Sequence, residues 1–341
     1  MNTTGLVKYA AALVAVAICS ACGGGSAVAP SNAAVSGAYT YVGRTLSVNG
    51  RLVTAARPPS SQPRYATILP DRHRRSKKFE YIINDYGSYA SIFDYPKSSA
   101  MIGQINGVGG QGCTNVLYGY GKKIFWIVAA NNQIEEFKVP QTPIKTLSVN
   151  YSFPSSCAMD ASGDLAVGIL YAAAKGGGDV VIFKNASGSG TVYTTPLDEE
   201  FFDGYDSQGN LFADGFTGAR SGFALVELPK GSSKFQTITT SNAVQFPGSV
   251  QWDGKYLAVF DQLANAFYRY AVSGTQATLK ATVSITGASD CAQTWIVKGL
   301  VYCGDNYGAG EVFKYPAGGS PVAVLSGNFD FPLGVTAAEK R

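Results

Sequence analysis

The sequence has little histidine, little charge and no long apolar run. Its 341 residues include a single histidine, His73, which lies ahead of the repeated part of the chain. A hydrolytic triad needs a histidine beside its nucleophile, so a Ser-His-Asp or Cys-His site is excluded from the repeats. The chain carries neither a Gly-x-Ser-x-Gly nucleophile elbow nor a P-loop motif. These absences exclude the commonest hydrolases and nucleotide-binding enzymes.

Charge is scarce and local. Charged residues make up 15% of the chain, and much of the net charge of +4 comes from one basic run, Asp71–Lys78. We interpret this run as a solvated lead-in to the first repeat, in preference to a contact with anionic lipid or polysaccharide. So local an excess is not typical of a nucleic-acid-binding surface, and we expect no nucleic-acid partner.

The apolar stretch Tyr9–Ile18 is too short to span a membrane as a helix, but it follows a basic residue, as a signal-peptide core does. Small residues before Cys22 and a Gly/Ser run after it resemble the lipobox of bacterial lipoproteins, although Cys19 stands where leucine is usual. We therefore expect residues 1–22 to form a lipoprotein signal, with Cys22 as the acylated first mature residue. Acyl chains would hold the chain at a membrane surface, outside the cytoplasm, and Gly23 favours the outer membrane. An ordinary secretory signal is the alternative.

Residues 23–75 have the composition of a tether. Gly, Ser, Ala and Pro dominate them, as in GGGSAVAPSNAAVSG and ARPPSSQP, which favours a flexible or extended spacer. Within the tether, residues 38–53 alternate between apolar and polar positions around Asn49-Gly50, a typical hairpin turn. The sequence therefore predicts a spacer that contains one small hairpin.

A short pattern recurs six times after the tether. It consists of a large or β-branched residue, a spacer, a second large residue (once Asn) and then Pro or Ala, and the last residue falls at positions 96, 140, 186, 229, 271 and 316. The steps between them are 44, 46, 43, 42 and 45 residues, a period typical of β-propeller blades. The pattern predicts an all-β propeller over residues 76–341.

The two ends of this region complement each other. A new repeat begins at Phe331-Pro332-Leu333-Gly334 but the chain stops at Arg341, and Phe79–Asp85 reads like the strand that this last repeat lacks. Pairing the two would remove two exposed sheet edges. The sequence therefore predicts six blades, with an N-terminal strand that closes the last blade.

The turns within the repeats carry Asp and Gly at fixed places, as in Asp206-Ser207-Gln208-Gly209-Asn210-Leu211 followed by Asp214. This pattern resembles NHL-type and gluconolactonase-like (senescence marker protein) six-bladed propellers, and also uncharacterised secreted bacterial propellers. The gluconolactonase resemblance implies a divalent cation at the channel mouth, held by carboxylate and amide oxygens. The Glu-Gly-Pro carboxylate of that family is absent here, and Gln111 occupies the corresponding stretch.

Three acids precede predicted inner strands, where groups that face the channel are expected: Asp203, Asp290 and Asp330. With Gln111 they form the candidate cation set, although turn formation is the commoner role of a loop Asp. Phe202 and Phe246 are candidates for stacking on a sugar or peptide, with blade packing as the favoured interpretation. A ring of acids and one amide (Asp85, Asn131, Asp214, Asp261 and Asp305) is interpreted as a set of turn caps.

Four cysteines lie in the repeats: Cys113, Cys157, Cys291 and Cys303. The first two are one blade period apart, so a bridge between neighbouring inner strands is reasonable. The other two flank a turn at Lys298-Gly299, which would place Cys303 opposite Thr294, so a bridge to Cys291 needs a bulge or a longer turn. All three pairings stay open. Among these four cysteines there is no C-x-x-C spacing, and the repeats contain no paired histidine, so a zinc site is not supported.

The leading functional hypothesis is a monomeric, membrane-anchored propeller that binds a protein, carbohydrate or small ligand without catalysis. A metal-dependent, lactonase-like hydrolase that uses Gln111 and the three acids is the alternative. A purely structural spacer of the cell surface is the third. The sequence identifies neither the ligand nor the face that binds it.

Overall fold

The computed structural model describes residues 41–42, 45–48, 51–54, 76–84, 89–128, 132–139, 142–150, 154–172, 177–218, 222–288, 290–305, 309–327, 329 and 332–340. The expected signal, with Cys22, and most of the tether, with His73, lie outside these residues. Apart from one 3-10 turn, η3 (Lys184–Ala186), all regular elements in the described part are strands. None of its helical segments is long and apolar enough to cross a membrane.

Three short strands lie within the tether. β1 (Tyr41–Val42), β2 (Thr45–Val48) and β3 (Arg51–Thr54) form an antiparallel sheet in the order β1-β2-β3. Val48 of β2 pairs with Arg51 of β3, so these strands lie on either side of the Asn49-Gly50 pair.

The other strands group into six four-stranded antiparallel blades, each written from its innermost strand outward. Blade 1 consists of β27 (Pro332–Glu339), β4 (Lys78–Asn84), β5 (Tyr89–Asp94) and β6 (Ser98–Asn106). Blade 2 consists of β7 (Gly112–Thr114), β8 (Lys123–Val128), β9 (Gln133–Lys138) and β10 (Thr142–Ser148). Blade 3 consists of β11 (Pro154–Met159), β12 (Leu165–Ala172), β13 (Gly177–Phe183) and β14 (Thr191–Thr194). Blade 4 consists of β15 (Glu199–Tyr205), β16 (Leu211–Thr217), β17 (Gly222–Leu228) and β18 (Gln236–Thr240). Blade 5 consists of β19 (Val250–Trp252), β20 (Leu257–Asp261), β21 (Ala266–Ser273) and β22 (Gln276–Ser284). Blade 6 consists of β23 (Cys291–Val297), β24 (Leu300–Asp305), β25 (Ala309–Lys314) and β26 (Ala323–Leu325). The outer strands β18 and β22 pair in parallel, which joins blades 4 and 5 at their rims.

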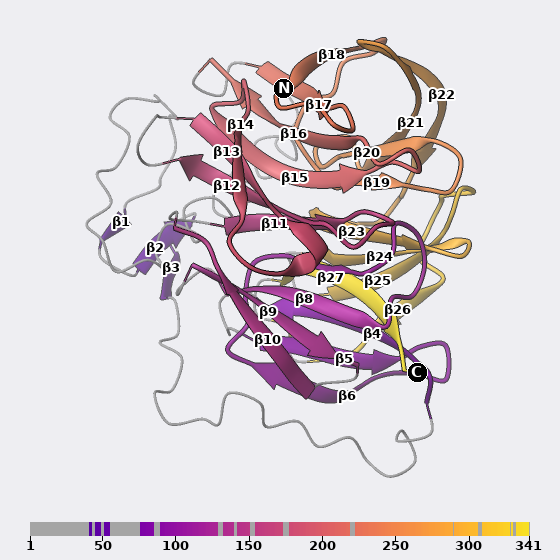
Figure 1. Ribbon diagram of the computed structural model, residues 1–341. Coiled ribbons are helices and arrows are strands. Elements are labelled where there is room, and N and C mark those ends of the chain that lie inside the picture. The colour runs from indigo at the N-terminus through magenta and orange to yellow at the C-terminus, as the bar shows by residue number, and fades with distance from the viewer. Residues whose placement is uncertain are drawn as a thin grey trace.

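The ring closes through blade 1. The C-terminal strand β27 pairs with β4, with Val335 opposite Ile82, and it contacts the inner strands β23 and β7 on its two sides. Figure 1 shows β27, in yellow, beside β4, in indigo, although they come from opposite ends of the propeller sequence. The predicted all-β propeller, and its closure by an N-terminal strand, are confirmed.

The repeated pattern has two physical origins. In five of the six copies its first large residue packs between blades: Phe93, Phe137, Phe183, Val226 and Phe313 are completely buried. In the fifth copy this residue is Tyr268, which is only partly buried. The turns of the repeats are held by aspartates that accept nearby N–H groups. Asp206 Oδ1 accepts from Gln208 N (2.8 Å) and Asn210 N (2.9 Å), while Gly209 adopts φ 85°, which suits glycine. Asp160 makes the equivalent bonds one blade earlier.

The four cysteines form two disulfides, each with a Cα–Cα distance of 5.7 Å. Cys113 of β7 is bonded to Cys157 of β11, which ties blade 2 to blade 3. Cys291 of β23 is bonded to Cys303 of β24, although the ladder places Thr294 opposite Cys303, because the register shifts between residues 291 and 294. Both bridges are therefore those considered from the sequence, the second through the required bulge. Two such bonds indicate an oxidising compartment outside the cytoplasm.

Candidate functional site

Amide side chains at the centre of the ring connect neighbouring blades. Gln251 of β19 donates from Nε2 to the Ile296 carbonyl oxygen (3.0 Å) and accepts the Ile296 N–H at Oε1 (2.7 Å). Gln293 of β23 donates to the Gly112 carbonyl oxygen (2.8 Å) and accepts from Gly112 N (3.2 Å) and Val335 N (2.9 Å). An amide carries the same donor and acceptor as a peptide group, so these side chains continue the strand pairing between blades.

The inner strands leave a cavity of about 30 Å³ on the axis. The residues that line it include Gln111, Met159, Asp203, Trp252, Gln293 and Trp295. This volume accommodates a few water molecules or a single ion. Pockets for small organic ligands are roughly 300–1,000 Å³, so a sugar or lactone does not fit in this cavity.

Two of the predicted site residues, Gln111 and Asp203, meet at this cavity. Gln111 donates from Nε2 to the Phe201 carbonyl oxygen (3.1 Å), and its Oε1 has no partner among the described residues. Asp203 is 6% exposed, and its Oδ1 likewise has no partner there. Both residues line the cavity, and each has one buried acceptor oxygen that could accept from a water molecule or bind a cation.

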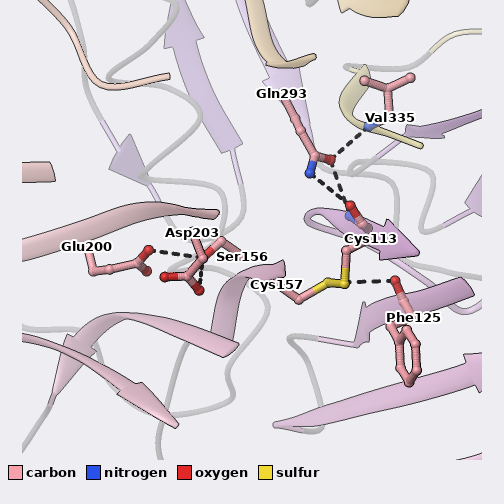
Figure 2. The surroundings of a disulfide bond; sticks show 9 residues. Cys113, Phe125, Ser156, Cys157, Glu200, Asp203, Gln293 and Val335 are labelled. Atoms are coloured by element: carbon pink, nitrogen blue, oxygen red, sulfur yellow. Dashed lines mark hydrogen bonds between the residues drawn. A yellow bond between two sulfur atoms is a disulfide. The ribbon is translucent and has the colours of Figure 1, made fainter. Parts of the chain in front are cut away.

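Asp203 belongs to a buried carboxyl pair. Ser156 Oγ lies 3.0 Å from Glu200 Oε1 and 2.9 Å from Asp203 Oδ2, as Figure 2 shows. One hydroxyl donates only one proton, so the second contact requires a protonated carboxyl group. Burial raises the pKa of Asp203 to about 7, and burial together with the Asp203 charge raises the pKa of Glu200. The pair therefore retains a proton near neutral pH.

Small residues make room for this pair. A Cβ at Gly168 of β12 would collide with the Glu200 carboxylate and with Ser156 Oγ, and a Cβ at Gly178 of β13 would collide with the Glu200 backbone. Ser155 Oγ donates to Glu200 Oε2 (3.2 Å) from the other side. Glu200 is thus held in place between blades 3 and 4.

The other predicted acids lie elsewhere. Asp290 is 2% exposed and precedes β23 by one residue, but it does not line the cavity. Gln293, Thr294 and Trp295 are the β23 residues that line it, and Asp290 precedes the first of them by three residues. Asp330 lies outside the described residues. The structure therefore brings Gln111 and Asp203 together but leaves Asp290 away from them.

Phe202 and Phe246 are packing residues in the described structure. They are 3% and 6% exposed and belong to one apolar cluster with Phe201 and Phe216. The rings of Phe216 and Phe246 meet edge to face with their centroids 5.0 Å apart. Phe202 also borders the cavity, but neither ring offers an exposed face for a sugar.

The interpretation of the repeated acids as turn caps is confirmed for Asp261. This last residue of β20 accepts from Leu263 N and Ala264 N, both at 3.1 Å. Asp214 instead lies within β16 and accepts from Gly248 N (3.2 Å), so it connects blades 4 and 5 and caps no turn. Asp85 and Asn131 lie outside the described residues.

The β7–β8 loop, residues 115–121, crosses one end of the cavity, and the repeat pattern gave no sign of it. Its Leu117 carbonyl accepts from Gln251 Nε2 (3.3 Å), and its Gly119 carbonyl accepts from Trp295 Nε1 (3.1 Å). Gly121 N donates to the Ala337 carbonyl oxygen (3.3 Å). A loop of blade 2 thus contacts blades 5, 6 and 1, and Leu117 itself lines the cavity.

The same loop contributes to a second buried carboxyl site. Tyr120 Oη and Tyr302 Oη each donate to Glu80 Oε1 at 3.1 Å, and Tyr95 N donates to Glu80 Oε2 at 2.9 Å. Glu80 is completely buried, and this burial raises its pKa to about 8. The sequence signal was a glutamate between two aromatic residues, Phe79 and Tyr81, within the strand KFEYIIN.

Neither the models of protein families nor the curated proteins match this sequence. Solved structures share its fold. A functionally unknown protein from Desulfotomaculum acetoxidans DSM 771 has a TM-score of 0.52 at 11% identity, and a protein of unknown function from Bacteroides caccae has 0.55 at 12%; each match covers 77% of this chain and 99% of the other. A candidate 6-phosphogluconolactonase from Bacteroides fragilis NCTC 9343 has 0.50 at 10%, covering 79% and 99%. At such identities the likeness shows the fold: this chain is a β-propeller.

Proposed function

We propose that this protein is a non-catalytic binding module: a six-bladed propeller outside the cytoplasm, anchored by acyl chains on Cys22, that binds a protein or carbohydrate on one face. The observation that carries the proposal is the filled axis. The amides of Gln251 and Gln293 bond to the backbones of neighbouring strands, and the remaining cavity of about 30 Å³ is too small for an organic substrate. A rigid ring whose centre is too narrow for an organic substrate presents its outer faces for recognition.

The test combines localisation with activity. The full chain is expressed in bacteria with radiolabelled palmitate, and C22A is the matched control. We expect label in the membrane fraction for the natural chain and none for C22A. The purified chain is then screened against lactones and phosphorylated lactones, with and without Ca²⁺, Zn²⁺ and Mn²⁺. A turnover that is lost in D203N would overturn the non-catalytic proposal, and label retained by C22A would overturn the anchor.

One observation favours a second candidate, a metal-dependent lactonase-like hydrolase. Gln111 and Asp203 line the cavity, and within the described part of the chain Gln111 Oε1 and Asp203 Oδ1 have no hydrogen-bond partner. Carboxylate and amide oxygens are ligands of divalent cations. The fold is shared with the candidate lactonase from Bacteroides fragilis. Metal analysis of the full chain, purified without chelator, separates the two candidates. One divalent ion per chain, lost in D203N but kept in D290N, would favour the hydrolase; no ion after incubation with Ca²⁺, Zn²⁺ and Mn²⁺ would eliminate it.

A further inference from the structure

A buried carboxylate lies against the second disulfide. Glu311 of β25 sits directly opposite Cys303 of β24, which is bonded to Cys291 of β23. The two sulfur atoms and a Glu311 carboxylate oxygen all lie within 4.8 Å of one another, and all three residues are buried. Three neighbouring strands of blade 6 thus direct one potential ligand atom each to the same point.

Glu311 is poorly satisfied there. It is 8% exposed, and its Oε2 has no hydrogen-bond partner among the described residues. Leaving a buried acceptor unpaired costs about 1–3 kcal/mol. The sulfur atoms of a disulfide carry no proton, so in the oxidised form they cannot donate a hydrogen bond to the Glu311 carboxylate. Reduction would change the chemistry of the cluster, because thiolates and a carboxylate are the ligands that Zn²⁺ takes in proteins.

We propose that reduction of the Cys291–Cys303 bond converts this cluster into a binding site for one thiophilic divalent cation, such as Zn²⁺. The ligands are the two sulfurs and the Glu311 carboxylate, with water in the fourth position. Asp305, opposite Cys291 in the ladder, adds negative charge nearby. The disulfide therefore keeps the site closed, and binding depends on the redox state of the chain.

The reaction balances with a dithiol as the reductant. The dithiol supplies two electrons and two protons, the bond between the two sulfurs breaks, two thiols form, and the dithiol becomes a cyclic disulfide. The cation then displaces both thiol protons to solvent and binds the thiolates. Glu311 binds as a carboxylate and supplies the third ligand.

The chain contains its own matched control. The Cys113–Cys157 disulfide has the same Cα–Cα distance of 5.7 Å, but the described residues place no carboxylate at a comparable distance from its sulfurs. Its neighbour is the Phe125 carbonyl oxygen, 3.9 Å from the Cys157 sulfur, as Figure 2 shows. If two thiols were enough to bind the cation, then Cys113 and Cys157 in their reduced form would bind one just as Cys291 and Cys303 do.

The experiment uses Co²⁺, which reports thiolate ligands by a near-ultraviolet charge-transfer band. Every chain in this experiment, the natural one included, carries C19S/C22S, because Cys19 and Cys22 form a C-x-x-C pair whose thiolates would also bind Co²⁺. The full chain is unfolded and reduced with dithiothreitol, then refolded without oxygen in the presence of Co²⁺, and circular dichroism checks the fold. We expect one equivalent of thiolate-bound Co²⁺ in the natural chain and in C113S/C157S, and none in C291S/C303S or in the oxidised chain. E311Q, which keeps the size of the side chain but removes its charge, should weaken binding at least tenfold.

Three results would overturn the proposal. They are a natural chain without the thiolate band, a band that persists in C291S/C303S, and an affinity of E311Q equal to that of the natural chain. A dithiol form that fails to regain its fold would count equally against it, since the site requires the folded blade.

Discussion

Replacement of Glu80 by glutamine should remove a large pH dependence of stability. Burial raises the pKa of Glu80 from 4.5 to about 8. Because the folded-state value lies above the unfolded one, the stabilisation is complete below pH 4.5 and is lost as the pH rises through 8. A shift of this size corresponds to about 5 kcal/mol of unfolding free energy across that interval. The natural chain should therefore unfold much more easily at pH 9 than at pH 5.

A glutamine fits the same contacts. Its carbonyl oxygen can accept from Tyr95 N, and its amide can donate to the hydroxyls of Tyr120 and Tyr302, which lie 3.2 Å apart. E80Q should therefore be close to the natural chain at pH 5 and more stable at pH 9 by several kcal/mol.

Urea unfolding between pH 5 and pH 9, with both disulfides intact, measures this difference. E339Q, on the neighbouring strand β27, controls for the loss of one negative charge and should follow the natural chain. Other buried carboxyls, Glu200 and Asp203 among them, also make the natural chain less stable at high pH, so the difference between E80Q and the natural chain is the informative quantity. If the two profiles run parallel across the whole range, then the assignment of a proton to Glu80 is wrong.

Three further predictions concern stability, each measured by urea unfolding at pH 7. Loss of the Cys113–Cys157 bond, which spans 44 residues, should lower the free energy of unfolding by about 4 kcal/mol, and loss of the Cys291–Cys303 bond, which spans 12, should lower it by about 3 kcal/mol. The longer loop has the larger effect because it gains more entropy in the unfolded chain when it is released. The reverse order would contradict this loop-entropy account. D206A removes the acceptor for two turn N–H groups and should cost about 1 kcal/mol, whereas the exposed neighbour S207A should cost little. G168A pushes a methyl group into the Glu200 carboxylate and should lower the free energy of unfolding by about 1–3 kcal/mol. In G222A the new methyl group would make only an ordinary van der Waals contact, 3.8 Å from Thr217 Oγ1, so equal effects of the two substitutions would disprove the close packing at Gly168.

The blade architecture was predictable because its signals are local. The aromatic repeat reports a residue that packs between blades, and the Asp-x-x-Gly turns report hydrogen bonds between residues two to four positions apart. The closing strand was predictable too, since a repeat that ends early implies its missing partner. The bulge in β23 between Cys291 and Thr294 followed from the register of one hairpin.

The candidate site was predicted only in part. Gln111 and Asp203 both line the cavity, but Asp290 does not. The sequence placed all of these residues near inner strands. The height along the propeller axis at which each side chain lies, however, depends on the register of six separate strands. The bulge between residues 200 and 202 is one such local shift that composition and periodicity do not reveal.

By itself, the sequence determined the repeat, the strand-rich blades, their turns and the closure of the ring, because each depends on residues close together in the chain or on matching ends. The tertiary structure alone decided which distant groups meet. Glu80 and Tyr302 are 222 residues apart, Gly112 and Gln293 are 181 apart, and Glu311 comes to lie beside a disulfide of its own blade. Such contacts exist only once the ring has closed and every strand has taken its register, since a shift of one residue turns each side chain to the opposite face of its sheet.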